Sequence, residues 1–376
     1  MKWDIFCSVV DNYGDIGVCW RLARQLAAEY GFEVRLMCDD LQVFARICPR
    51  LDATAACQRA GGVEIRRWDG ELHVAPAQVV LESFGCRLPE VYVEAMGRAS
   101  AAPLWINFEY LSAENWVERC HGLPSRHGHL PLVTWFFYPG FTAATGGLLR
   151  EAHLLRERDA FLADREVQVQ YWRSLGLAPA ARNLSLFCYG GAPLDAWLAE
   201  LAAAPQPLRL IVPEGVANAE LARWGLAVQA GSSVQHGGLS LVRIGLQDQP
   251  GYDRLLWACD MNVVRGEDSF LRALWAGRPF CWHIYPQQDG AHAAKLEAFL
   301  GRYLGEAGEG LARAAAVAFM RAWNGLDGAP DIAAAWRALQ AQPAECAQFA
   351  AARAQHFAGG TDAAAGLVKF VREKLQ

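Results

Sequence analysis

The chain has 376 residues, of which 53% are hydrophobic and 20% charged, and its formal net charge is −5. This length exceeds the roughly 250–300 residues at which one hydrophobic core normally divides, so two domains are expected. The composition excludes an intrinsically disordered chain, and the net negative charge argues against a general binder of nucleic acid or of membrane surfaces.

The eleven cysteines are scattered, and no C-x-x-C pair occurs. Most lie inside apolar runs, which is typical of buried, reduced thiols. The N-terminus enters an apolar run at once and lacks the layout of a signal peptide. No segment reaches the roughly 20 apolar residues of a membrane span. We therefore expect a soluble cytoplasmic protein.

Short apolar runs alternate with helical periods in the first half. Strands are expected at 2–10, 33–40, 63–70, 77–86 and 103–111, with helices at 17–31, 41–49 and 89–99. This alternation predicts a parallel sheet with right-handed crossovers. Residues 115–151, rich in aromatic residues and glycine, are predicted to form functional loops with short strands.

A second alternating series follows a charged helical stretch at 150–175. Its apolar runs lie at 183–190, 207–215, 239–246 and within 252–286, before Ala-rich helices and an amphipathic C-terminal helix. The sequence therefore predicts two α/β halves of similar size. In such folds the chemistry lies in a crevice at the carboxyl ends of the strands.

The first candidate site follows the first strand, in "VVDNYGDIGV". Asp11 and Asp15 are four residues apart at a strand-to-helix turn, where side chains project into the crevice. The G-x-G-x-x-G of a dinucleotide site is missing. The alternative is that Asp15 or Asn12 caps the helix while Asp11 forms an Asx-turn. Gly14 and Gly17 fit either interpretation.

The second candidate site is Arg265-Gly266-Glu267-Asp268-Ser269, between an apolar strand and a helix. Ser269 and the free N–H groups of the helix start can bind a phosphate, and Arg265 adds a guanidinium fork. Glu267 is too close to such an anion to bind it and is expected to contact sugar hydroxyls. The alternative is a well-formed helix start with acidic residues in its first turn.

The third candidate set is aromatic. Phe187 and Tyr189 are alternate residues at a strand end, Gln249 and Tyr252 come from another loop, and Tyr285 follows a further strand. A pyrimidine can stack between aromatic faces while an amide reads its edge. For each ring taken singly, core packing is the alternative.

Two groups of residues are candidates for metal binding. His121, His127 and His129 lie in one loop, but no carboxylate or cysteine completes a ligand set, and Asp39-Asp40 is only an acidic pair. A P-loop, a G-x-S-x-G motif and an H-E-x-x-H motif are all missing from the sequence. No metal is predicted.

Four long stretches resemble the EarP family of bacterial protein-arginine rhamnosyltransferases, which modify translation elongation factor P. They are "VVDNYGDIGVCWRLARQL", "WINFEYLSAENWVERCHGLPS", "FFYPGFTAATGGLLRE" and "YDRLLWACDMNVVRGEDSFLRALWAGRPFCWHIYPQQDGAHAAKLEAFL". The resemblance implies a GT-B fold of two facing Rossmann-like domains with a central cleft. The acceptor domain would be 1–172, completed by 358–376, and the dTDP-β-L-rhamnose domain would be 173–357.

The resemblance also assigns residues. Asp15 is the expected general base, assisted by Asp11, and Glu267 is grouped with them as catalytic. The donor-binding positions are Phe187, Tyr189, Gln249, Tyr252, Arg265, Gly266, Asp268, Ser269 and Tyr285, and the loop near donor and acceptor adds Asn12, Tyr13, Gly14 and Gly17. The family's aromatic before Gln249 is missing near Leu246.

The acceptor guanidinium is a cation and a poor nucleophile, so a carboxylate pair would attract it, orient it and take its proton. The charge of the departing diphosphate would be met by Arg265, Ser269 and the helix N-terminus, without metal or other cofactor. Inversion would give α-rhamnosyl-arginine, which in the family activates the factor for rescue of ribosomes stalled at polyproline. The alternatives are another dTDP- or UDP-sugar GT-B enzyme, such as a nucleotide-sugar epimerase, and a non-catalytic module that binds the factor.

Overall fold

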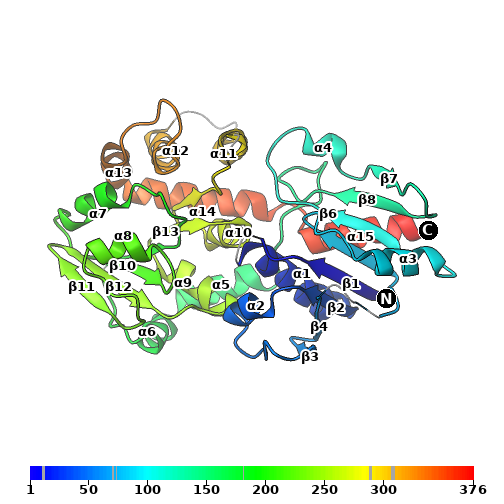
Figure 1. Ribbon diagram of the computed structural model, residues 1–376. Helices are drawn as coiled ribbons and strands as arrows, with labels where there is room; N and C mark the ends of the chain where they lie inside the picture. The colour runs from blue at the N-terminus through cyan, green and yellow to red at the C-terminus, as the bar shows by residue number, and fades with distance from the viewer. Residues whose placement is uncertain (11–12, 70–71, 73, 181, 288–289, 306–309) are drawn as a thin grey trace. The chain divides into compact units, whose positions relative to one another are not determined.

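The computed structural model describes all residues except 11–12, 70–71, 73, 181, 288–289 and 306–309. The chain divides into two compact units (Figure 1). The N-terminal unit consists of Met1–Ala152 together with Gly359–Gln376, and the C-terminal unit is His153–Ala358.

In the part of the chain that the structure describes, the N-terminal unit contains an eight-stranded sheet of order β3-β4-β2-β1-β5-β6-β8-β7. Its strands are β1 Lys2–Cys7, β2 Glu33–Cys38, β3 Cys57–Ala60, β4 Val63–Arg67, β5 Val79–Ser83, β6 Leu104–Phe108, β7 Pro124–Arg126 and β8 Val133–Phe137. The six central strands are parallel, and β3 and β7 pair antiparallel at the edges. The carboxyl ends of the parallel strands therefore meet at one edge.

The helices of this unit are α1 Gly14–Tyr30, α2 Leu41–Ile47, α3 Glu90–Arg98, α4 Val117–Cys120 and α15 Ala363–Leu375. Tyr92 and Met96 of α3 pack with Phe6, Val80 and Trp105 in a buried cluster on the sheet. Burial of such side chains contributes about 1.5–3 kcal/mol each. This cluster packs α3 against the central strands of the sheet.

The start of the C-terminal helix α15 packs closely against the backbone of the rest of the N-terminal unit. Leu148 pairs with Asp362, whose carboxylate caps α15 at Ala364 N, 3.0 Å away. Gly147 has φ +87°, and a Cβ there would lie 2.2 Å from the carbonyl oxygen of Thr361. Only glycine fits this position, because a side chain would collide with backbone.

The described residues of the C-terminal unit contain a six-stranded sheet of order β11-β12-β10-β9-β13-β14. The strands are β9 Asn183–Leu186, β10 Leu208–Pro213, β11 Ser233–His236, β12 Leu239–Ile244, β13 Met261–Arg265 and β14 Phe280–His283. All pairs are parallel except that of β11 with β12. Asn262 on β13 accepts from Ser185 Oγ at 2.6 Å, which joins the neighbouring strands β9 and β13.

The helices of the C-terminal unit are α5 Leu154–Ala163, α6 Arg165–Ser174, α7 Leu194–Ala202, α8 Asn218–Arg223, α9 Gln249–Ala258, α10 Glu267–Ala276, α11 Ala291–Leu304, α12 Leu311–Trp323, α13 Ile332–Gln340 and α14 Pro343–Ala358. The units divide after Ala152, whereas the sequence places the boundary at residue 172. The reason is that α5 and α6 pack on α9: the Phe161 ring lies 5.8 Å from that of Trp257, and Tyr171 Oη donates to the carbonyl of Gly251 at 3.0 Å.

Among the described residues, no helix is long and apolar enough to cross a membrane.

Candidate active site

Asp15 lies in the first turn of α1 and is 2% exposed. Its Oδ2 accepts a hydrogen bond of 2.8 Å from the backbone N–H of Val10, and its Oδ1 accepts one of 3.1 Å from the hydroxyl of Tyr110. The N-terminal end of a helix stabilises a carboxylate. The structure therefore holds this carboxylate from two directions at the carboxyl edge of the sheet.

Tyr110 follows β6 and is 41% exposed. Its ring stacks on Phe84 with centroids 4.4 Å apart and planes 17° apart. Phe84 has φ +57°, a left-handed conformation that is uncommon outside glycine. The loop after β5 thus carries an aromatic support that positions the Tyr110 hydroxyl over Asp15.

The sequence left open that Asp15 only caps the following helix, and its neighbours test this alternative. The N-cap of α1 is Tyr13, which makes no side-chain cap hydrogen bond, and Gly14 begins the helix. The N–H of Gly17 donates to the carbonyl of Tyr13 at 2.9 Å. Asp15 is therefore not the N-cap. Asp11 and Asn12 lie outside the described residues.

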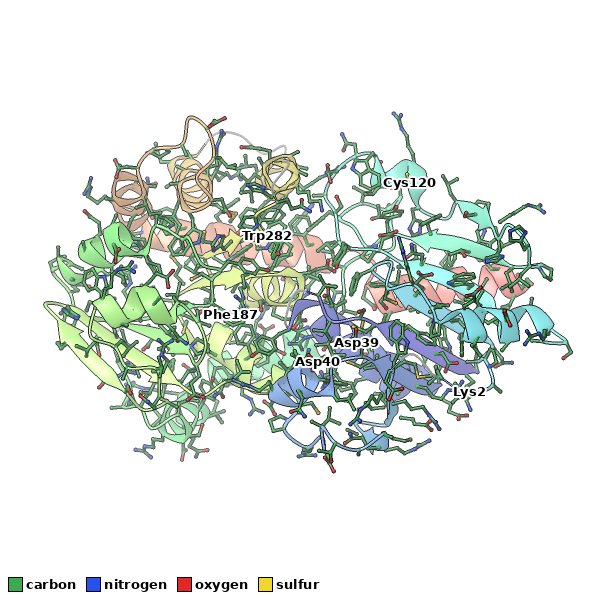
Figure 2. All side chains as sticks on the ribbon, in the orientation of Figure 1. Lys2, Asp39, Asp40, Cys120, Phe187 and Trp282 are labelled. Carbon is green, nitrogen blue, oxygen red and sulfur yellow. The ribbon has the colours of Figure 1, made fainter. Side chains whose placement is uncertain are left out.

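The acidic pair after β2 has structural partners. Asp39 accepts hydrogen bonds from Ser8 Oγ and, at 2.9 Å, from Val9 N, while Asp40 caps α2 at Val43 N. Both aspartates are labelled in Figure 2. Because Val9 bonds to Asp39, the first strand ends at Cys7 and not at residue 10 as its apolar pattern predicts.

The loop histidines also contact the backbone. His121 Nδ1 accepts from Tyr138 N at 3.0 Å, and burial lowers the pKa of His121. His127 Nδ1 accepts from Leu130 N at 3.2 Å. Within the described parts of the chain, no group of three histidine, cysteine or acidic side chains is arranged to hold a metal ion.

In the C-terminal unit, Arg265 stands at the end of β13 against two aromatic rings. Its guanidinium carbon lies 4.6 Å from the ring centroid of Phe187 and 4.7 Å from that of Tyr189. Its Nη1 also donates to the carbonyl of Cys188 at 3.3 Å. Cation–π contact and this hydrogen bond fix a planar cation at the carboxyl end of the central strands.

Further aromatic side chains complete this cluster. The Tyr252 ring meets Phe187 edge-on at 5.9 Å, and Tyr285, 55% exposed, meets Tyr189 at 5.3 Å. Burial raises the pKa of the Tyr252 phenol, whose hydroxyl lies beside Ser269. The cluster thus runs from a covered floor at Phe187 to an exposed ring at Tyr285.

The start of α10 is shaped by Gly266. This residue has φ 66° and ψ −174°, a conformation that is nearly restricted to glycine. Its carbonyl accepts a hydrogen bond of 3.1 Å from Nε1 of Trp282 on β14. Figure 2 labels Trp282. Glu267 and Asp268 occupy the first turn of α10. Two carboxylates therefore share this turn with the N–H groups expected to bind phosphate.

A buried ion pair connects the two helices that carry these residues. Arg272 of α10 donates to Asp253 of α9 through Nε and Nη2, both at 2.8 Å. The same α9 begins with Gln249, which is 4% exposed, after the N-cap Asp248. A fork-to-fork pair of this kind fixes orientation as well as distance. It sets Gln249 and Tyr252 relative to the start of α10.

His283, at the end of β14, contacts the aromatic cluster through Tyr189. Its Nδ1 accepts from Tyr189 N at 3.2 Å, and its ring lies 5.4 Å from that of Tyr189. Burial, and then the charge of Arg265, lower the pKa of His283 to about 4. The imidazole is therefore neutral at pH 7 and acts as an acceptor.

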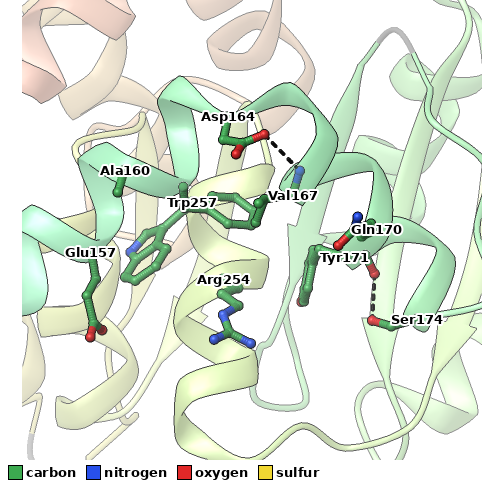
Figure 3. A pocket seen from close by; sticks show the side chains of 10 residues that line it. Glu157, Ala160, Asp164, Val167, Gln170, Tyr171, Ser174, Arg254 and Trp257 are labelled. Atoms are coloured by element: carbon green, nitrogen blue, oxygen red, sulfur yellow. Dashed lines mark hydrogen bonds between the residues drawn. The ribbon is translucent and has the colours of Figure 1, made fainter.

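A separate cavity of about 590 Å³ lies between α5, α6 and α9 (Figure 3). Its lining comprises Glu157, Ala160, Phe161, Asp164, Val167, Gln170, Tyr171, Ser174, Arg254 and Trp257. It contains none of the predicted donor residues, which gather instead around Arg265.

Comparison with known proteins decides the family. A family model described as Elongation-Factor P (EF-P) rhamnosyltransferase EarP matches residues 3–372. A protein-arginine rhamnosyltransferase of Pseudomonas putida is 50% identical over 378 residues, covering 99% of each chain. The chain belongs to the EarP family. The enzyme class is accordingly that of a rhamnosyl-transferring glycosyltransferase.

Solved structures agree with this assignment. A structure that concerns EarP-mediated arginine glycosylation of translation elongation factor EF-P is 37% identical, with a TM-score of 0.70 and 99% of both chains covered. The glycosyltransferase VinC, solved in complex with dTDP, shares the fold at 11% identity, with a TM-score of 0.52 and 99% of both chains covered. The α/β fold is therefore the GT-B fold, with two Rossmann-like domains.

For this EarP-family chain, the structure brings many predicted donor residues together within one unit. Phe187, Tyr189, Tyr252, Arg265 and Tyr285 form one contact cluster. The phosphate-binding and base-stacking roles of these residues stay predictions.

Several supporting residues were missed from the sequence. Tyr110, Asp253, Arg272, Trp282 and His283 reach the candidate sites through contacts with residues distant in the sequence. The only sequence signal for these residues was their position: each lies at or just after a strand end, or on a helix that faces a strand end.

Proposed function

We propose that this chain transfers L-rhamnose from dTDP-β-L-rhamnose to an arginine side chain of translation elongation factor P, with inversion to α-rhamnosyl-arginine. The observation that carries the proposal is the match of the EarP family model to residues 3–372, together with 50% identity to a protein-arginine rhamnosyltransferase. The modified factor would then act in rescue of ribosomes stalled at polyproline, in the cytoplasm.

The acceptor side of the proposal rests on Asp15. A guanidinium is always cationic and its lone pairs are delocalised, so it needs a carboxylate that attracts it and removes a proton as the new C–N bond forms. Asp15 is held by Val10 N–H and Tyr110 Oη. Both contacts restrict its orientation, which favours proton transfer in one preset geometry. Asp11 is proposed to assist.

The donor side rests on the cluster around Arg265. The departing dTDP carries growing negative charge, and a fixed guanidinium with a helix N-terminus can stabilise it. Gln249 and the aromatic rings are proposed to bind the thymine, Ser269 and Asp268 the diphosphate region, and Glu267 the sugar. Gly266 permits the close approach of backbone. No metal or other cofactor is assigned a role.

Exposed apolar side chains support a protein as acceptor. Val10 is 80% exposed, Tyr110 41% and Trp116 47%, all in the N-terminal unit. Val10 and Tyr110 follow β1 and β6 respectively, at the edge where Asp15 lies. Large exposed apolar and aromatic side chains are enriched at protein interfaces.

The proposal is tested by incubating elongation factor P with this chain and dTDP-β-L-rhamnose and measuring the intact mass of the factor. We expect a gain of one deoxyhexose, located on an arginine by fragmentation, and an α linkage by NMR. Conversion of dTDP-rhamnose to another nucleotide sugar without added protein would instead indicate an epimerase. An unmodified factor together with intact donor would contradict the proposal.

A further inference from the structure

A cavity of about 440 Å³ lies on the N-terminal unit, next to the start of α3. Its floor is a row across the sheet, because Glu82 of β5 pairs in register with Asn107 of β6, and Asn107 pairs with Phe136 of β8. Each of these residues is the last but one of its strand. The cavity is therefore at the same carboxyl edge that presents Asp15.

Glu82 provides a buried carboxyl group in this cavity. It is 9% exposed and accepts hydrogen bonds of 3.0 Å from Trp105 Nε1 and from the backbone N–H of Arg87. Both donors are neutral, and burial raises the pKa of Glu82. A carboxylate in this position is stabilised when a cation comes within a few ångströms.

Asn107 provides a second acceptor. Its Nδ2 donates to Glu109 Oε1 at 2.9 Å, while its Oδ1 is buried and accepts no hydrogen bond from the described residues. A buried acceptor without a donor costs about 1–3 kcal/mol, so such groups normally meet a water or a ligand. An N–H donor that enters the cavity could supply this partner.

The rest of the lining favours a cationic donor. The rings of Trp105 and Phe136 can contact a cation through their faces, and Glu90 adds a negative charge. Arg87 also lines the cavity, and its charge partly offsets the effect of burial on the pKa of Glu82, but its side chain is exposed to solvent. A buried carboxylate, an unpaired carbonyl oxygen and aromatic walls together match a lysine or arginine side chain.

The cavity is connected to the candidate base through a short stretch of chain. Asn107 contacts Glu109, and the next residue, Tyr110, donates its hydroxyl to Asp15. Burial, and then the charge of Glu82, raise the pKa of Glu109. A side chain seated on Glu82 and Asn107 would therefore anchor the acceptor beside its modified arginine.

We propose that this cavity, with Glu82 and Asn107 as its recognition groups, binds a second lysine or arginine side chain of the acceptor protein and so selects the acceptor. The inference rests on the proposed function. It predicts an effect on acceptor binding and none on donor binding, because every residue that lines the cavity lies in the N-terminal unit, whereas the Arg265 cluster lies in the C-terminal unit.

The test compares Glu82→Gln and Asn107→Leu with the wild type, with elongation factor P as the varied substrate. We expect KM for the factor to rise about tenfold in each, as for loss of a charged or buried hydrogen bond, with kcat and the Kd of dTDP-β-L-rhamnose unchanged. The matched control is Glu94→Gln on α3, whose side chain is 45% exposed and pairs with Arg98. Its KM should equal that of the wild type.

A scan of lysine and arginine to glutamine in the factor, leaving out the modified arginine, should find one position with the same rise in KM. Its effect should not add to that of Glu82→Gln. If Glu82→Gln lowers the melting temperature, the KM values of Asn107→Leu and of the charge reversal Glu90→Lys test the proposal instead. An unchanged KM in these variants, or a loss confined to kcat, overturns the cavity proposal alone. A wild type that does not modify the factor overturns the proposed function, and this inference with it.

Discussion

The hydroxyl of Tyr110 donates a 3.1 Å hydrogen bond to Oδ1 of Asp15, across 95 positions of sequence. The bond joins the loop after β6 to the first turn of α1. It leaves the carboxylate with one oxygen on a neutral side-chain donor and the other on the backbone of Val10. The candidate base is therefore oriented by a residue that is itself partly exposed to an incoming acceptor.

Replacing Tyr110 tests this relationship. Tyr110→Phe removes the donor but keeps the stacking on Phe84, and hydrogen bonds to charged groups contribute about 1.5–3 kcal/mol. We expect kcat/KM for the acceptor to fall about tenfold or more, with the Kd of the donor unchanged. Tyr110→Ala should fall further because the stacked ring is lost. Wild-type kinetics in both variants would contradict the positioning role.

Arg265→Lys tests the donor cluster. The variant keeps the positive charge but loses the planar guanidinium that lies against Phe187 and Tyr189. We expect the Kd of dTDP-β-L-rhamnose, measured by calorimetry, to rise about tenfold or more. Arg254→Lys, at an exposed position of α9, is the control. An Arg265→Lys protein that binds the donor as the wild type does would rule out a specific role for the guanidinium.

Local sequence patterns predicted the donor loop well. An apolar strand that stops at Arg265 and a helix that starts at Glu267 are encoded by neighbouring residues, and the structure has both. The roles of Asp253 and Arg272 could not be predicted in the same way. Both sit in helices, and only the packing of α10 on α9 reveals that they form a buried pair.

The same contrast applies to the strands. The edge strands β3 and β7 have no alternating apolar pattern, because their side chains are mostly exposed. Their pairing depends on the neighbouring strand, which sequence periodicity does not report. Conversely, Val10 is apolar yet 80% exposed, so its pattern predicted a longer first strand than exists. The early end of the first strand lies at the carboxyl ends of the parallel strands, where the candidate acceptor site is.

The buried pair itself predicts a stability effect. Arg272→Met or Asp253→Asn leaves one charge buried without its partner, which costs about 3–5 kcal/mol of unfolding free energy. Urea denaturation of each variant and of the wild type measures this loss of unfolding free energy. The exposed pair Arg337–Glu200 is the control, where Glu200→Gln should cost less than about 1 kcal/mol. Equal losses in the two pairs would show that burial is not the deciding factor.

His283 predicts a pH dependence of stability. Its pKa is lowered to about 4 in the folded protein from 6.5, so between these values the unfolded chain holds a proton that the folded chain lacks. The unfolding free energy contributed by His283 is therefore present above pH 6.5. It is lost as the pH falls, by up to about 1.4 kcal/mol per unit.

Denaturation at several pH values checks this sign. His283→Asn should flatten the fall of stability between pH 6.5 and 4, whereas His153→Gln, at a position with a 50% exposed side chain, should leave the slope as in the wild type. Parallel curves for His283→Asn and the wild type would show that the buried imidazole does not contribute.

The most direct test of the account is Asp15→Asn, assayed with elongation factor P and dTDP-β-L-rhamnose by intact mass. Asparagine keeps the size and an acceptor oxygen but cannot take a proton. We expect transfer to fall by about 10²–10⁴-fold. The Kd of the donor should stay within twofold of the wild type, because the donor residues lie in the other unit. Transfer at the wild-type rate by Asp15→Asn would contradict the assignment of Asp15 as the base.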